Sequence, residues 1–148
     1  MAAAKSIALC GAGMISGAHA MAASVLKMPV IAVASRSQEK STERANQLNA
    51  KSVEYSQLPS GADIVVVATP PAQHFDHAVY SLQRGAAVII EKPLAYTLNE
   101  ADRLTATLQA LQWAQEIIVV DAPGQCPADL RAFEYRNVPL GVYPVTTD

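Results

Sequence analysis

Two glycines near the amino terminus have the spacing of a phosphate-binding turn. Gly11 and Gly13 follow the short apolar run 6–10, and an alanine-rich segment begins directly after them at Met14 and Ile15. Gly11 permits a tight turn, and Gly13 lets a pyrophosphate approach the backbone closely. The helix that follows supplies unpaired N–H groups and a positive dipole end. The pattern predicts a dinucleotide site; the alternative is a plain strand-to-helix turn in an unrelated sheet.

The second short apolar run, 30–34, ends in Ser35, Arg36 and Ser37, about twenty residues beyond the glycine turn. NAD-selective sites place a carboxylate at this point to bind the ribose hydroxyls, and none stands here. Arg36 has the chemistry to pair with a 2′-phosphate through two hydrogen bonds and to stack on an adenine. We therefore expect NADP(H) to bind in preference to NAD(H). The alternative is that Arg36 is a solvated residue before a helix.

The elements that position these residues alternate along the chain. Short β-branched runs predict buried strands, and the run 64–68 is typical of a parallel strand covered on both faces. Alanine-rich or amphipathic segments separate the runs and predict helices. Strands are expected at 6–10, 30–34, 52–55, 64–68, 87–90 and 117–120, and helices at 14–27, 38–49, 72–84 and 98–115. The order predicts an α/β fold with a doubly wound parallel sheet, the Rossmann fold.

Three motifs in fixed order resemble those of a known family. They are the segment from Gly11 to His19, then Ala68-Thr69-Pro70-Pro71-Ala72-Gln73-His74, then Glu91-Lys92-Pro93-Leu94. Together they resemble the amino-terminal domain of the glucose–fructose oxidoreductase, inositol dehydrogenase and MocA (Gfo/Idh/MocA) family, over about residues 5–115. The resemblance implies NAD(P)-dependent hydride transfer at the CH–OH group of sugars, cyclitols or related alcohols.

The resemblance also implies cofactor-binding roles for residues that follow the fourth and fifth strands. These residues are Thr69, Pro70, Pro71, His74, Glu91 and Lys92. The family usually has asparagine where Pro71 stands, so one side-chain hydrogen bond to the cofactor is lacking here. A cis bond between Lys92 and Pro93 is compatible with the motif.

Lys92 is the catalytic residue that the resemblance implies. Oxidation of an alcohol needs a proton acceptor or a cation near the oxygen as the hydride leaves, and a partly desolvated ammonium beside a nicotinamide would titrate closer to neutral pH. Without the resemblance, Lys92 would be interpreted as a solvated lysine in a turn.

The resemblance ends before the chain does. In the family a second α/β domain follows, with a catalytic histidine in an Asp-x-x-x-His pattern, and this sequence has no histidine after His77. We expect a dinucleotide-binding domain over 1–121 and an irregular, proline-containing tail over 122–148, as a truncated or frame-shifted reading of a longer gene would give. Such a chain would bind NADP(H) with little or no turnover, and a sugar or polyol would bind only with a second domain supplied. The face that docks that domain would be an apolar patch prone to self-association.

Other function classes share parts of these motifs. A non-catalytic NAD(P)-binding regulatory or partner-binding module would keep every cofactor residue. An S-adenosylmethionine methyltransferase shares the first glycine turn but usually has an acidic residue where Ser35 and Arg36 stand. His74, Asp76 and His77 have the spacing of metal ligands on a helix, but no further ligands accompany them, and we expect no metal.

Composition limits the remaining classes. With 148 residues, 51% apolar and 16% charged, the chain can bury the core of one domain. The formal net charge of −2, without a lysine or arginine block, gives little attraction to nucleic acid or to an anionic membrane. No apolar run reaches the ~20 residues that cross a bilayer. The two cysteines are too few for a disulfide scaffold. Residues 1–26 partly resemble a signal peptide, but Gly11 and Gly13 interrupt its apolar core. With no bilayer-crossing run either, we expect a cytoplasmic protein.

Overall fold

A single parallel sheet organises the chain in the computed structural model, which describes residues 4–111 and 117–119. Its strands lie in the order β3-β2-β1-β4-β5-β6 and every neighbouring pair is parallel. They are β1 (Ile7–Cys10), β2 (Val30–Ala34), β3 (Lys51–Val53), β4 (Ile64–Val67), β5 (Ala87–Ile90) and β6 (Ile117–Val119). The chain runs outward from β1 to β3 and then from β4 to β6 on the other side. The predicted doubly wound sheet is therefore confirmed.

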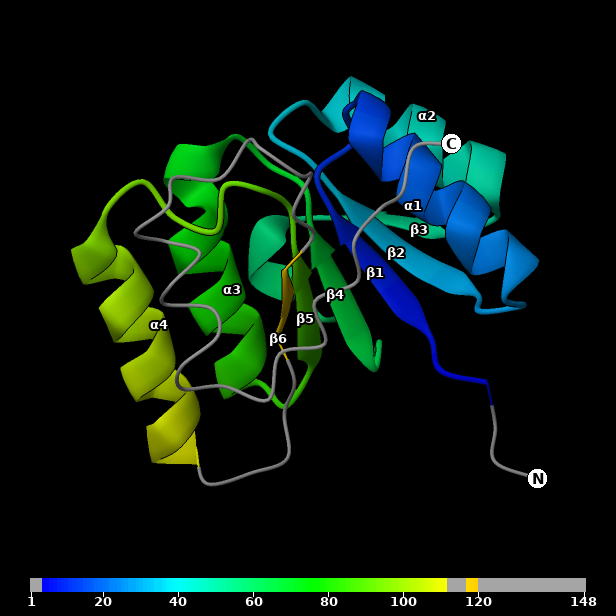
Figure 1. The fold of residues 1–148 in the computed structure, drawn as a ribbon. Coiled ribbons are helices and arrows are strands. Elements are labelled where there is room, and N and C mark those ends of the chain that lie inside the picture. The colour runs from blue at the N-terminus through cyan, green and yellow to red at the C-terminus, as the bar shows by residue number, and fades with distance from the viewer. Residues whose placement is uncertain (1–3, 112–116, 120–148) are drawn as a thin grey trace, which may run out of the picture.

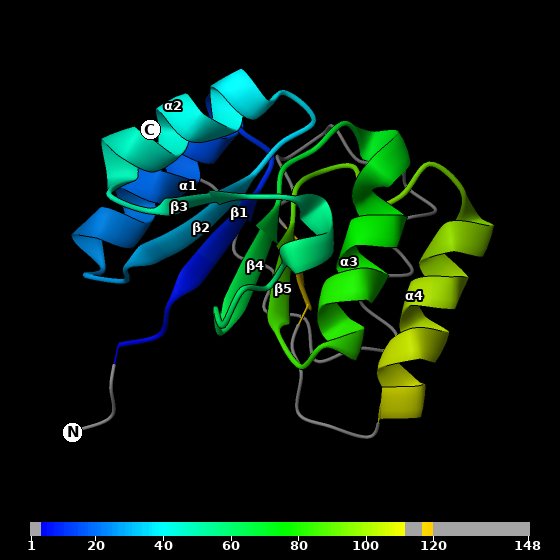
Figure 2. The same ribbon diagram turned by 180° about the vertical axis from the view of Figure 1, so that it is seen from behind.

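Helices of the described residues cover both faces of the sheet (Figures 1 and 2). The helices α1 (Met14–Val25) and α2 (Gln38–Leu48) lie on one face, and α3 (His74–Gln83) and α4 (Leu98–Leu111) lie on the other. Two short 3-10 turns, η1 (Tyr55–Gln57) and η2 (Pro71–Gln73), follow β3 and β4. In the part of the chain that the structure describes, no helix is both long and apolar enough to cross a membrane.

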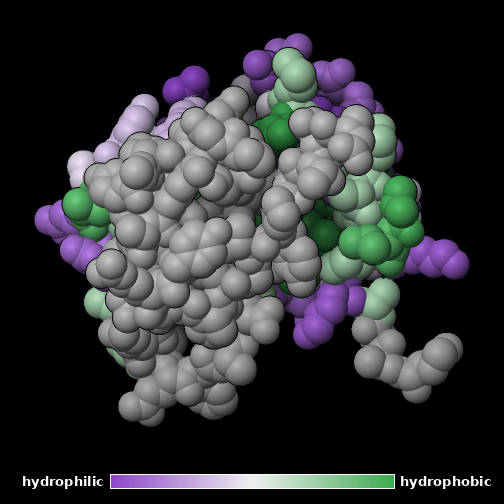
Figure 3. Space-filling model, viewed as in Figure 1, coloured by the Kyte–Doolittle hydropathy of each residue, from purple (hydrophilic) through white to green (hydrophobic). Residues whose placement is uncertain are grey.

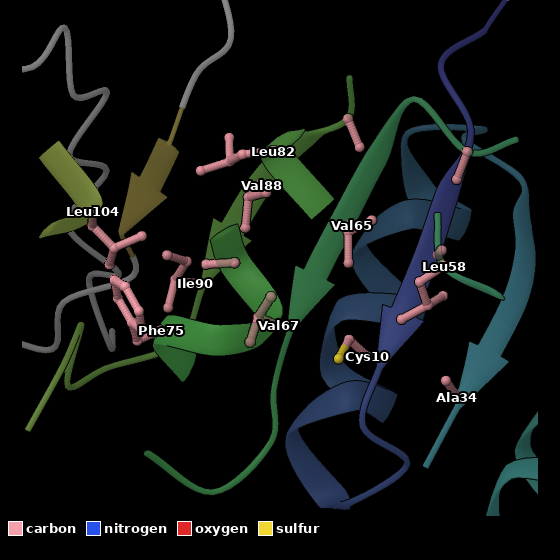
Figure 4. Close-up of a cluster of buried hydrophobic side chains, with 14 of the residues drawn as sticks. Cys10, Ala34, Leu58, Val65, Val67, Phe75, Leu82, Val88, Ile90 and Leu104 are labelled. Carbon is pink, nitrogen blue, oxygen red and sulfur yellow. The ribbon is translucent and has the colours of Figure 1, made fainter. Parts of the chain in front are cut away.

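Successive residues of the central strands enter two hydrophobic layers, because side chains alternate between the faces of a sheet. The layer beneath α1 and α2 contains Leu9, Val33, Val66, Ala20, Ala23 and Ala45. The layer beneath α3 and α4 contains Cys10, Val65, Val67, Ile90, Phe75, Leu82 and Leu104, all labelled in Figure 4. Each fully buried Val or Leu stabilises the fold by about 1.5–3 kcal/mol. Burial also raises the pKa of the Cys10 thiol to about 12, so this cysteine is a core residue without nucleophilic character.

The ends of the helices differ from the prediction by a few residues, for local reasons. The first helix stops at Val25 rather than at Lys27, because Lys27 has a left-handed backbone with φ of 57°. The third helix begins at His74 rather than at Ala72, because the proline-led segment Pro71–Gln73 forms a 3-10 turn first.

The start of α4 carries a modified capping box. Thr97 Oγ1 accepts a hydrogen bond from the N–H of Glu100 at 3.2 Å. The Glu100 carboxylate, however, accepts from the N–H of Tyr96 at 2.9 Å, one residue before the cap. The predicted continuation of this helix over 112–115 and the predicted tail over 122–148 lie outside the described residues.

The turn after β1 passes close to the end of β4. Gly11 has φ of 120°, and a Cβ placed on it would lie 2.6 Å from the carbonyl oxygen of Ala68. Both the backbone conformation and the close approach require glycine. We expect Gly11→Ala to lower the free energy of unfolding by about 2–4 kcal/mol, measured by urea denaturation followed by circular dichroism.

Gly61 provides the matched control for this substitution. It also has a positive φ, 84°, but a Cβ placed on it meets nothing within 4 Å. Gly61→Ala is therefore expected to cost only the backbone penalty of about 1 kcal/mol. If both variants lowered the free energy of unfolding equally, the close approach of the turn to Ala68 would not contribute to stability.

Candidate functional site

A cavity of about 320 Å³ opens at the carboxyl edge of the sheet, where the strand order reverses. Open α/β sheets bind their ligands at this point. Seven residues expected to bind a cofactor line it. Gly11 and Gly13 come from the turn after β1, Ser35, Arg36 and Ser37 from the end of β2, and Thr69 and Pro70 from the end of β4.

The glycine turn leaves the amino end of α1 open. Gly13 is the N-cap residue, has extended backbone, and a Cβ placed on it would meet nothing within 4 Å. No side chain caps the first turn of α1, so its N–H groups are available to an anion. Ser16, in the first turn of α1, is buried and donates its hydroxyl to the Gly13 carbonyl at 2.6 Å. Its side chain is small and already paired, which allows α1 to pack closely on the sheet.

Thr69 gives the opposite wall an unpaired hydrogen-bonding group. Its Oγ1 is the one buried side-chain oxygen or nitrogen, among the described residues, that has no hydrogen-bond partner. Leaving such a hydroxyl unpaired costs about 1–3 kcal/mol. A bound polar group that reached this oxygen would recover that free energy.

The end of the cavity beyond β2 is polar and basic. Ser37 caps α2, since its Oγ accepts a hydrogen bond from the N–H of Lys40 at 3.3 Å. The cap sets the first turn of α2 so that Lys40 lines the cavity together with Arg36 and Tyr55. Of the described residues on this wall, none carries a carboxylate.

Sequence reasoning missed Lys40, Tyr55 and Gln73, which also line the cavity. A signal existed for Lys40, because it stands three residues after Ser37, and serine before a predicted helix is a typical N-cap residue. Tyr55 follows the third strand at the same edge of the sheet, so its position could have been inferred from the order of strands.

The remaining predicted residues lie outside the main cavity. Met14 borders a neighbouring hollow, lined on α2 by Lys40, Glu43, Arg44 and Gln47. Ile15, Pro71, His74, Glu91 and Lys92 are not among the residues that line either space. His74 is buried behind the turn after β4, and Lys92 is exposed beside a cis bond to Pro93.

Residues 5–115 match the sequence model of an oxidoreductase family with an NAD-binding Rossmann fold, Gfo/Idh/MocA. The chain belongs to the Gfo/Idh/MocA family. This confirms the resemblance carried by the three motifs and identifies residues 5–115 as an NAD(P)-binding Rossmann domain. The open turn at Gly13 and the unpaired Thr69 hydroxyl fit such a cofactor.

Individual members of the Gfo/Idh/MocA family agree with this assignment. Glucose-6-phosphate 3-dehydrogenase of Bacillus subtilis is 32% identical over 109 residues, which are 72% of this chain and 31% of that protein. UDP-N-acetylglucosamine 3-dehydrogenase GnnA from Acidithiobacillus ferrooxidans is 25% identical with a TM-score of 0.71, covering 78% of this chain and 38% of its own. WlbA dehydrogenase from Bordetella pertussis, solved with NADH and UDP-GlcNAcA, is 25% identical with a TM-score of 0.67, covering 73% and 33%. The chain thus spans about a third of the length of these relatives.

The histidines of α3 make structural contacts in this Gfo/Idh/MocA domain. The His77 ring packs on that of Tyr55, with centroids 4.3 Å apart. Both ring nitrogens of His74 lie 2.8 Å from backbone carbonyl oxygens. In the described part of the chain, no group of three or more His, Cys, Asp or Glu residues could hold a metal ion.

Burial lowers the pKa of His77 below 6.5; a smaller contribution from Asp76 raises it, and one from His74 lowers it. The unfolded chain therefore takes up this proton at a higher pH than the folded chain. The contribution of neutral His77 to the free energy of unfolding is therefore fully present above pH ~6.5. It is lost as the pH falls from there through the folded-state pKa. We expect His77→Gln to reduce the loss of unfolding free energy between pH 7 and pH 5, measured by urea denaturation. An unchanged pH dependence would contradict the assignment.

Proposed function

We propose that this domain binds NADP(H) and prefers it to NAD(H). The observation that carries the proposal is the wall of the cavity after β2, where Arg36 and Lys40 stand with Ser35 and Ser37. A 2′-phosphate would receive charge-assisted hydrogen bonds from this wall. The ribose diol of NAD would find no carboxylate acceptor among the same residues.

The rest of the cofactor would follow the edge of the sheet toward β5. The pyrophosphate would lie over Gly13 and the amino end of α1, and the nicotinamide half would extend past Thr69 and Pro70. Lys92, after β5, would place its ammonium where a substrate oxygen gains or loses a proton. A bound nicotinamide would supply the hydride chemistry. Thr69 and Pro70 would bind and orient it, and the Lys92 ammonium would place a positive charge beside it.

We also propose that the reaction of the whole protein is oxidation or reduction at a CH–OH group of a sugar, cyclitol or related alcohol. Family membership supports the reaction class, and the names of two relatives support phosphorylated or nucleotide-linked sugars as substrates. The 148-residue chain alone is expected to bind cofactor with little or no turnover, because no histidine follows His77 to serve as the family's catalytic histidine. A cytoplasmic location is part of the same proposal.

The second candidate is a non-catalytic NAD(P)-binding module that regulates or binds a partner. It is favoured by the position of Lys92, which does not line the cavity that would hold the cofactor. A partner protein whose affinity changes on addition of NADPH would support it. Among the described residues, α1 exposes the apolar side chains of Met14, Met21 and Val25. Figure 3 shows hydrophobic surface at the right of the view. Self-association through such a face stays a prediction.

Titration calorimetry of the purified chain with NADPH tests the first proposal. We expect saturable binding of one molecule per chain. No binding up to about 1 mM NADPH, a concentration that reveals interactions as weak as about −4 kcal/mol, would overturn the proposal.

A further inference from the structure

We infer that two histidines, His19 and His74, are positioning residues for the segment that carries Lys92. One holds the residue before Lys92, and the other holds the residue after it. The inference rests on the proposed function, because it concerns how Lys92 is placed beside the nicotinamide half of a bound cofactor.

His19 fixes the residue before Lys92. It lies on α1, and its Nε2 is 2.6 Å from Oε1 of Glu91, with the two side chains only 18% and 11% exposed. A short bond to a carboxylate in such a shielded position is a strong one. The Glu91 N–H also donates to the Val67 carbonyl at 3.0 Å, which ties the backbone to β4. Glu91 is thus held from the sheet and from the helix that begins at the glycine turn.

His74 fixes the residue after Lys92. Its Nδ1 lies 2.8 Å from the carbonyl oxygen of Pro93, and its Nε2 lies 2.8 Å from the carbonyl oxygen of Thr69. Carbonyl oxygens only accept, so the ring donates from a protonated nitrogen, and the tautomer decides which carbonyl receives that hydrogen bond. The buried ring therefore joins the Lys92 segment to the cavity wall at Thr69.

The two contacts constrain the backbone on both sides of Lys92 while its own side chain stays exposed. Small displacements of a group that acts on a bound ligand are costly, so such supports matter for affinity and rate. Neither contact involves the wall after β2 where Arg36 and Lys40 stand. Loss of a histidine contact should therefore weaken binding of the nicotinamide half and spare the adenine half.

Two ligands separate these halves: NADPH, and adenosine 2′,5′-bisphosphate, which carries the adenine half alone. We expect His19→Ala in the full chain to raise the Kd for NADPH about tenfold and to change the Kd for the bisphosphate less than about twofold. His19→Gln keeps an N–H that reaches toward Glu91 and should restore part of the NADPH affinity. His19 is the residue to substitute, since it is less buried than His74.

Asp63→Asn is the matched control. Asp63 also links two distant segments, accepting hydrogen bonds from Ser6 N and Oγ at 2.8 and 2.9 Å, but at the amino edge of the sheet. It should leave both Kd values unchanged. The inference would be overturned if His19→Ala raised the Kd of both ligands equally, or left the Kd for NADPH unchanged. Either result would leave the proposed function standing as long as the wild-type chain binds NADPH. Failure of the wild-type chain to bind either ligand would instead overturn the proposed function, and the inference with it.

Discussion

Replacing Gly13 by aspartate should abolish NADPH binding without unfolding the chain. The space above Gly13 is open within the fold, so a side chain there meets no protein atom within 4 Å. Gly13 is also the N-cap of α1 with φ of −76° and ψ of −174°, a position and conformation that suit aspartate. The same carboxylate would occupy the approach of the pyrophosphate and repel it. Stability and binding are therefore expected to respond independently.

Two measurements on Gly13→Asp separate an effect on cofactor binding from an effect on stability. The free energy of unfolding should stay within about 0.5 kcal/mol of that of the wild type. The Kd for NADPH should rise at least about 100-fold, measured by titration calorimetry. Ser24→Asp adds the same charge at an exposed position near the other end of α1 and should leave the Kd unchanged. Retained NADPH affinity in Gly13→Asp would show that the cofactor does not cross this turn.

Replacing Arg36 by alanine should remove the preference for NADP(H). Arg36 is exposed and lines the cavity end that would hold the 2′-phosphate. A hydrogen-bonded charge pair of this kind contributes about 1.5–3 kcal/mol, which corresponds to about a 10- to 150-fold rise in the Kd for NADPH. The Kd for NADH should change less than about threefold, because NADH has no 2′-phosphate.

Arg84→Ala separates this contact from a general effect of charge. Arg84 is an exposed arginine whose guanidinium lies on the ring of Tyr80, 3.2 Å from its centroid, and it does not line the cavity. The two variants have the same net charge, so an effect of long-range attraction would appear in both. Equal loss of NADPH affinity in the two variants would rule out Arg36 as the phosphate-binding residue.

Much of the fold could be predicted from the sequence because local patterns determine it. The β-branched run at 64–67 has strand propensity and apolar side chains on both faces, which suits the centre of a parallel sheet. Gly85 follows α3 with φ of 87°, a backbone conformation that favours glycine and stops a helix. The boundaries that moved did so where backbone geometry overrode helix propensity, as at Lys27 and Pro71–Gln73.

The predicted site residues fall into two groups: those placed by local sequence and those placed by contacts with distant parts of the chain. The turns after β1, β2 and β4 follow directly from strand ends, so seven residues chosen from the sequence line one cavity. The contact between His19 and Glu91 joins residues 72 positions apart, and no local pattern specifies it. His74 was chosen as a pocket residue, but its ring is used to hold two backbone carbonyls. The role of a side chain that connects two helices or strands can be assigned only when the positions of those elements are known.

The preference for NADP(H) is tested by measuring the affinity of the unmodified chain for NADPH and for NADH. Both are measured by titration calorimetry in one buffer at fixed ionic strength. Arg36 and Lys40 at the end of the cavity, without a carboxylate on the described wall, predict that NADPH binds at least about tenfold more tightly than NADH. Tighter binding of NADH by the wild-type chain would contradict the assignment.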